Sequence, residues 1–171
     1  MTSDLILHLN EITVDMASIM FDCSLTSSSE TELCSRPGSK DRFIVLVSLG
    51  NANFQGQIVI GFPESVMESE ILNSVLDLAE DEDEKDELIQ SSLGELVNTI
   101  SGEYIVHDEL TRKYGDLTLS PPLVWDQTEE SCPRFTKSDG CSGRVKSESD
   151  SMEINTFFSV NPIKKVSTYG I

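Results

Sequence analysis

Basic residues are scarce in this chain. Only 12 of its 171 residues are Lys or Arg, whereas 30 are Asp or Glu, and the formal net charge at pH 7 is −18. Such an excess of negative charge repels nucleic acids and anionic membrane surfaces, because both are polyanions. We therefore expect neither nucleic acid nor a membrane as a partner.

Long apolar runs are also lacking. No stretch approaches the roughly 18 apolar residues that a membrane-spanning helix needs, and the N-terminus has no basic flank and short apolar block of a signal peptide. These absences predict a cytoplasmic protein. A length of 171 residues suits one domain with its own core and is short for two, so we expect a single domain over residues 1–171.

Cysteine and histidine are few and scattered. The cysteines are too far apart in sequence for a CxxC metal site, and without a secretory signal reduced thiols are favoured over a disulfide or zinc site. The histidines stand alone, without a recognisable Ser or Cys nucleophile motif, so a hydrolase triad has no support. We expect both histidines to be ordinary helix-surface residues. These six residues are Cys23, Cys34, Cys132, Cys141, His8 and His107.

What the chain does have is hydrophobic periodicity, which predicts three helices. The first runs to about residue 21 and has a broad apolar side that should pack on a sheet. Pro63 is well placed to open a second helix that continues to residue 78. A long third helix is expected over residues 86–114, where Gly115 can end it. The apolar side of the first helix comprises Leu5, Leu9, Ile12, Met16, Ile19 and Met20.

Strand patterns lie between and after these helices. Apolar, β-branched runs at residues 43–49 and 57–62, joined by a glycine-bounded turn, predict an antiparallel hairpin. Alternating apolar residues predict another strand over residues 152–160. Residues 117–125 should be extended, because proline disfavours helical angles in the residue before it. Together the elements predict an α/β sandwich in which helices pack on a largely antiparallel sheet.

Two polar stretches with glycine and proline are expected to be loops. Residues 25–40 form the first, with one short strand at its start, and residues 129–147 form the second, as a mobile loop or an irregular strand. Residues 80–87 are almost all acidic. A calcium-binding EF-hand loop counted from Asp81 would need glycine where this chain has Asp86. We expect a solvated linker there, and an acidic metal-binding protein remains a third alternative for the function.

The long third helix has two contrasting faces. Ser91, Glu95, Asn98 and Gly102 have spacings that place them together opposite an apolar stripe. On most surface helices such a face is simply solvated. However, Asn is a poor helix former, and Gly costs about 1 kcal/mol relative to Ala within a helix. Both residues therefore indicate a surface that contacts a partner. The stripe, which should face a core, consists of Ile89, Leu93, Leu96, Val97, Ile100 and Tyr104.

The spacing of these residues carries a family resemblance. Ser91, Glu95, Asn98 and, after a gap of 22 residues, Pro121 match the (Asp/Ser)-xxx-Glu-xx-Asn-x22-Pro signature. The chain thereby resembles the CheC, CheX and FliY family of chemotaxis phosphatases, and it is most similar to CheX over roughly residues 41–124. The resemblance implies a CheC-like α/β sandwich and, for CheX-type members, a homodimer joined through the sheets.

A second copy of the signature, which CheC-type members carry, is not found. In the first helix, Leu7, Asn10 and Glu11 stand in the wrong order. Glu70 and Asn73 repeat the inner pair, but both outer positions of the signature are missing around them. The resemblance is therefore to members with one site.

The resemblance also implies a function. The partner would be a phosphorylated CheY-type receiver domain, which supplies its own aspartyl phosphate, Mg²⁺ and lysine, so that the chain needs no cofactor of its own. Asn98 would orient the attacking water, and Glu95 would pair with the receiver's lysine. Gly102 would permit close approach and Ser91 would be a peripheral contact, while Pro121 would direct the path of the chain. The alternative is a non-catalytic module that docks on a receiver or flagellar-switch protein.

Overall fold

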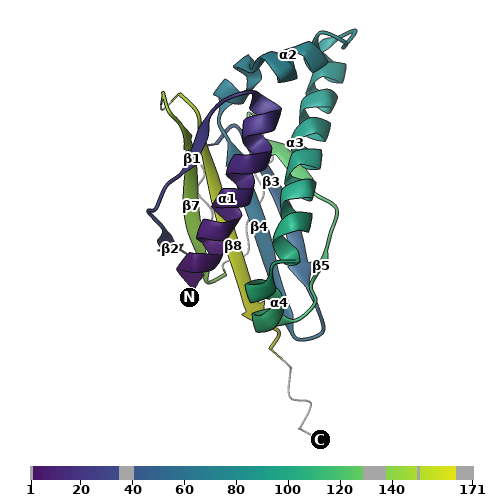
Figure 1. The fold of residues 1–171 in the computed structure, drawn as a ribbon. Coiled ribbons are helices and arrows are strands. Elements are labelled where there is room, and N and C mark those ends of the chain that lie inside the picture. The colour runs from purple at the N-terminus through teal and green to yellow at the C-terminus, as the bar shows by residue number, and fades with distance from the viewer. Residues whose placement is uncertain (1, 35–40, 129–137, 150, 165–171) are drawn as a thin grey trace, which may run out of the picture.

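One antiparallel sheet forms the frame of the molecule (Figure 1). The computed structural model describes residues 2–34, 41–128, 138–149 and 151–164. Within these residues the sheet has eight strands. They are β1 (Leu25–Ser27), β2 (Glu32–Cys34), β3 (Phe43–Gly50), β4 (Phe54–Phe62), β5 (Thr118–Leu119), β6 (Leu123–Asp126), β7 (Gly140–Ser147) and β8 (Glu153–Pro162).

The strand order sets what lies at the centre and what lies at the edges. The order is β1-β7-β8-β4-β3-β5, with β2 also paired to β7 and β6 also paired to β3. The long strands β7, β8, β4 and β3 are therefore central. The short strands β5 and β6 both pair with β3 and extend the sheet at that edge.

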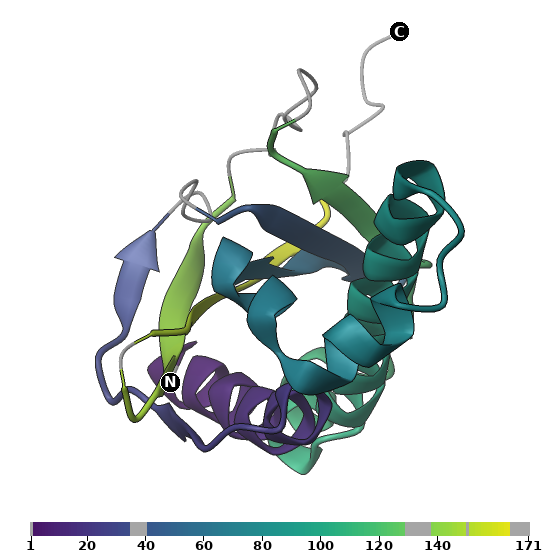
Figure 2. The same cartoon turned by 90° about the horizontal axis from the view of Figure 1, so that it is seen from above.

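Helices cover one face of this sheet. Figures 1 and 2 show α1 and α3 side by side on that face, with α2 at one end of the pair. None of the helices described is long and apolar enough to cross a membrane. The helical elements are α1 (Thr2–Phe21), the 3-10 helix η1 (Glu64–Glu68), α2 (Glu70–Leu76), α3 (Glu82–Ile105) and α4 (Asp108–Tyr114).

Alternation along the strands divides the apolar residues between two faces. On β3, Val45 and Val47 belong to the main core between the sheet and the helices, whereas Ile44 lies in a second, smaller cluster. That second cluster also contains buried Val59 and Phe157 and occupies the opposite face. The predicted α/β sandwich with a largely antiparallel sheet is confirmed.

Several predicted elements are confirmed closely. The first helix ends at Phe21, as expected. The hairpin of β3 and β4 is present, but its strands are longer and the turn is reduced to residues 51–53. The strand expected at residues 152–160 is β8, and its residues Ile154, Thr156 and Phe158 are all buried.

The predicted long helix over residues 86–114 is wrong in both its start and its continuity. It begins earlier, because Asp81 is the N-cap and its side chain accepts a hydrogen bond from the N–H of Glu84 at 2.8 Å. Most of the expected acidic linker is therefore the first part of α3. The helix also stops at Ile105, because His107 takes extended angles and opens α4, which Gly115 then ends with a positive φ of 74°.

The predicted second helix over residues 63–78 is also divided. Ser69 takes extended backbone angles between η1 and α2, and its side chain accepts a hydrogen bond from the N–H of Leu72. A serine in this position favours a break, because its side chain accepts the hydrogen bond that the N–H of Leu72 would donate to a backbone carbonyl in a continuous helix. The two pieces together still cover most of the expected span.

The two loop predictions are wrong over much of their length. Residues 140–147 are not an irregular segment but the central strand β7, and a second strand, β2, follows the expected β1. Glycine at positions 140 and 143 obscured the strand pattern of β7. Residues 28–31 and 138–139 form neither helix nor strand, as expected, whereas residues 35–40 and 129–137 lie outside the described residues.

Candidate functional site

Helix α3 is held firmly by its apolar stripe. All six residues predicted to face a core are buried. The hydroxyl of buried Tyr104 also donates a hydrogen bond to the backbone oxygen of Leu5 in α1, at 2.9 Å. A helix fixed along one side presents the other side in a defined orientation, which a docking or catalytic surface needs.

The opposite side of α3 carries the signature residues. Ser91, Glu95 and Asn98 are exposed, and Gly102 is half-buried. Within the described part of the chain, the side chains of Glu95 and Asn98 have no hydrogen-bond or ion-pair partner. A β-carbon added at Gly102 would meet no atom within 4 Å. The structure thus brings these four residues together on one open surface.

The final residue of the signature lies on the neighbouring segment rather than on the helix. Pro121 is exposed and lies between β5 and β6, both of which pair with β3. The preceding Ser120 is fastened to β3, because its N–H donates to the oxygen of Ser48 at 2.8 Å. Next along the chain, Pro122 comes close to α3, since a β-carbon on Gly94 would lie 3.6 Å from its Cγ.

Arg42 anchors the last residue of β6, Asp126. The Nε and Nη2 atoms of Arg42 both donate to the carboxylate of Asp126 at the end of β6, each at 2.9 Å. A third donor, Nη1, reaches Glu64 of η1 at 2.9 Å. Burial acts to raise the pKa of Asp126, but the hydrogen bonds from Arg42 and Thr128 outweigh it and hold the pKa below its usual value.

A shallow apolar groove, which sequence analysis missed, lies between α1 and α3 beside the signature residues. Its volume is about 440 Å³, and Ser91 and Glu95 form part of its lining. The expectation that Ile19 packs on the sheet is wrong, because this side chain is 74% exposed at the groove. The apolar side of α1 is broader than the sheet can cover. The other lining residues are Met16, Met20, Leu88, Ser92, Leu96 and Thr99.

The expectation that both histidines are ordinary helix-surface residues is wrong, because both are half-buried and their rings contact each other. The ring centroids of His8 in α1 and His107 at the start of α4 are 3.7 Å apart, with an angle of 33° between the ring planes. Nδ1 of His107 is buried without a hydrogen-bond partner among the described residues. Nothing in the sequence could have paired residues so far apart. This contact packs α4 against α1.

Burial limits the reactivity of two of the described cysteines. Cys23, Cys34 and Cys141 are free thiols, whereas Cys132 lies outside the described residues. Burial is the main factor that raises the pKa of the Cys23 and Cys141 thiols, so less of the reactive thiolate is present near neutral pH. Among the described residues, no three His, Cys, Asp or Glu side chains form a group that could hold a metal ion.

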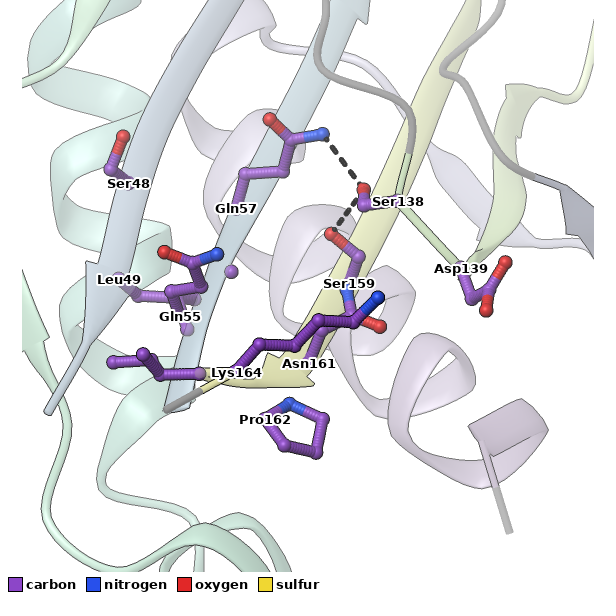
Figure 3. A pocket seen from close by; sticks show the side chains of 12 residues that line it. Ser48, Leu49, Gln55, Gln57, Ser138, Asp139, Ser159, Asn161, Pro162 and Lys164 are labelled. Carbon is purple, nitrogen blue, oxygen red and sulfur yellow. Dashed lines mark hydrogen bonds between the residues drawn. The ribbon is translucent and has the colours of Figure 1, made fainter. Parts of the chain in front are cut away.

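A polar hollow of about 730 Å³ lies on the sheet face away from the helices (Figure 3). Ser138 donates a hydrogen bond to the hydroxyl of Ser159 at 3.0 Å, and Nε2 of Gln57 donates to Ser138 at 3.4 Å. The described residues of its lining include no His or Cys, and Asp139 and Lys164 are its charged members. Among the described residues, the hydroxyls of Ser138 and Ser159 are bonded to each other and to Gln57 rather than to a base, so no activated nucleophile is seen there.

The partial copies of the signature lie in unsuitable places. Asn10 is fully buried and accepts a hydrogen bond from the hydroxyl of Thr156. Glu70 and Asn73 are exposed, but they lie on the short helix α2. Only the face of α3 combines exposure with a long, buried support.

Comparison with known proteins identifies the family. A family model described as "Chemotaxis phosphatase CheX" matches residues 43–144. That span includes the whole of α3, both edge strands and the segment that contains Pro121. No curated protein matches the sequence.

Solved structures share the fold at low sequence identity. The chemotaxis protein CheX from Desulfovibrio desulfuricans has a TM-score of 0.68 and 16% identity, over 92% of this chain and 99% of that chain. CheX from Vibrio vulnificus has a TM-score of 0.66 and 12% identity, with the same coverage. A chain of the CheX-CheY-BeF3-Mg+2 complex from Borrelia burgdorferi has a TM-score of 0.64 and 15% identity, over 90% of this chain and 96% of that chain.

Proposed function

This chain belongs to the CheX family of chemotaxis phosphatases, and we propose that it hydrolyses the aspartyl phosphate of a CheY-type receiver domain. The observation that carries the proposal is the open face of α3, where Glu95 and Asn98 are exposed without partners in the described chain. The fold makes no use of these two side chains. They are therefore free to complete an active site on another protein.

A phosphorylated receiver already contains most of the required chemistry. Its Mg²⁺ and lysine neutralise charge on the transferred phosphoryl group, so the missing part is a water molecule in line with the phosphorus. The amide oxygen of Asn98 would hold this water by accepting a hydrogen bond from it, while the amide N–H donates a hydrogen bond elsewhere. Attack by the water breaks the bond between phosphorus and the aspartyl oxygen, and releases inorganic phosphate and the free aspartate.

The other signature residues would position the two proteins. Glu95 would form a salt bridge with the receiver's lysine, which fixes the reach of Asn98 one helical turn away. Gly102 would allow close approach, and Ser91 would contact the periphery of the receiver. Pro121 would direct the edge segment past α3 without taking part in the chemistry. The solved complex of CheX with CheY, BeF3 and Mg+2 from Borrelia burgdorferi supports a receiver as partner, and the receiver would supply the Mg²⁺.

The proposal also includes the setting of the protein. We place it in the cytoplasm as a single domain, where it would end a chemotaxis-type signal. A homodimer joined through the sheets is supported by Leu46 and Trp125, which pack against the second apolar cluster on the face away from the helices and are only half-buried. Light scattering on the purified chain would test this assembly.

The first experiment is the decay of aspartyl phosphate on candidate receivers. Asn98→Ala should reduce the acceleration by on the order of 10² or more, because the in-line water is lost, while affinity for the phosphorylated receiver is retained. Asn73→Ala, in the exposed partial copy on α2, is the matched control and should leave the rate unchanged. Glu95→Ala should instead weaken binding, and unchanged affinity would remove its role as an anchor.

The alternative function gives a different result. If the chain binds a receiver but accelerates decay on none of them, the non-catalytic docking module is supported and the phosphatase is excluded. If Asn98→Ala retains the full rate, another group must orient the water.

A further inference from the structure

The groove between α1 and α3 is directly continuous with the signature face. Ser91 and Glu95 belong to both surfaces, because these two signature residues also line the groove on α3. Any partner that touches Glu95 therefore reaches the groove without a change of orientation. The described lining residues on α3 are Leu88, Ser91, Ser92, Glu95, Leu96 and Thr99.

The α1 side of the groove is apolar and adaptable. Ile19 is 74% exposed at this place, and an exposed β-branched side chain of that size contributes nothing to the core. Met16 and Met20 are half-buried beside it, and their unbranched side chains can repack around different apolar groups. The combination is typical of a surface that binds a side chain of a partner.

The charges around the groove restrict that partner. The described residues of the lining include one carboxylate, that of Glu95, and no lysine or arginine. The net charge of −18 adds a negative field around it. An anionic group is therefore disfavoured, whereas an apolar side chain that lies beside a cation fits both the groove and its rim.

We propose that this groove binds one apolar side chain of the receiver, located beside the lysine that Glu95 contacts, and that it sets which receiver is recognised. The proposal rests on the proposed function, because that function places the receiver's lysine at Glu95. The groove contributes affinity and specificity, whereas Asn98 contributes the rate.

Replacement of the exposed isoleucine tests the proposal. Ile19→Ser should weaken binding of a Mg²⁺-beryllofluoride-loaded receiver about tenfold in titration calorimetry, because one buried apolar side chain loses its contact. In the decay assay the loss should appear as a higher half-saturating receiver concentration rather than a lower maximal rate. Ile19→Leu should restore binding, because the apolar contact is kept.

The matched control removes an equally exposed apolar side chain elsewhere. Leu33 on β2 is 77% exposed and does not line the groove, so Leu33→Ser should leave receiver binding unchanged. Methyl-labelled methionine gives a direct readout. The NMR signals of Met16 and Met20 should shift on addition of the receiver, whereas that of buried Met152, which directly precedes β8, should not.

The outcomes separate this inference from the proposed function. If Ile19→Ser binds as tightly as the unaltered chain while Asn98→Ala loses its rate, the groove proposal is overturned and the phosphatase stands. If Ile19→Ser weakens binding to a receiver that is never dephosphorylated, the groove is supported on a docking module. If the unaltered chain binds no receiver at all, both proposals fail.

Discussion

At the scale of single residues, Gly102 has a place in the helix that the fold does not require. A β-carbon there meets nothing within 4 Å, so Gly102→Ala should stabilise the chain by about 1 kcal/mol through helix propensity. In the same variant, receiver binding should weaken, because the added methyl group stands on the proposed docking face. Urea unfolding and titration calorimetry on one preparation would measure both effects.

Gly94 supplies the control on the same helix. A β-carbon at this position would make ordinary contacts with Val124 and Pro122, at 3.4 and 3.6 Å, on the side of α3 that faces β6. Gly94→Ala should therefore stabilise the helix without affecting binding. Equal affinity in both variants would show that Gly102 does not contact the receiver.

At the scale of elements, α1 lies on the sheet at a position that one glycine makes possible. A β-carbon on Gly143 of β7 would lie 2.5 Å from Nδ2 of Asn10 in α1, and Asn10 is fully buried. Gly143→Ala should destabilise the chain by on the order of 1–3 kcal/mol, because a well-packed contact must open. Chemical unfolding of this variant would measure the loss.

A double-mutant cycle tests the cause of that loss. Asn10→Ala removes the side chain that the new methyl group would strike, so the effect of Gly143→Ala should become much smaller in its presence. Additive losses would mean that the clash with Asn10 is not the cause. The loss would then arise within strand β7.

At the scale of the whole molecule, the free energy of unfolding should depend on pH through two carboxylates whose pKa values are shifted in opposite directions. Burial is the main factor that raises the pKa of Asp41 from its usual 3.8 to about 6, although a hydrogen bond from Asn155 at 2.8 Å acts in the other direction. The folded state therefore holds this proton more tightly than the unfolded chain does. Asp126, which is paired with Arg42, shows the reverse.

The sign of the effect of Asp41 follows from this difference. Its contribution to stability is fully present below pH 3.8 and falls as the pH rises to about 6, by at most about 3 kcal/mol. Asp41→Asn removes this dependence. The free energy of unfolding of the variant, minus that of the unaltered chain, should rise between pH 4 and pH 7, because other carboxylates cancel in the difference. A flat difference would show that Asp41 titrates normally.

Much of the fold could be predicted because its signals are local. Neighbouring residues alone indicate the helical spacing of apolar residues in α1, their alternation in β8 and the turn between β3 and β4. Strand β7 was missed because the need for its glycines appears only in the folded chain, where a β-carbon would strike Phe157 at position 140 and Asn10 at position 143. The break at His107 was missed for a similar reason, since the ring of this residue packs against His8 of another helix.

The sequence by itself determined the signature face, because the spacing of Ser91, Glu95 and Asn98 on a helix places them together whatever the rest of the chain does. It also determined which side of α3 is buried. Only the tertiary structure decided that α1 lies beside α3 and leaves Ile19 exposed next to Glu95. Hydrophobic periodicity states that a side is apolar, but the amount that neighbouring elements cover depends on how they pack, and that determines where a partner can bind.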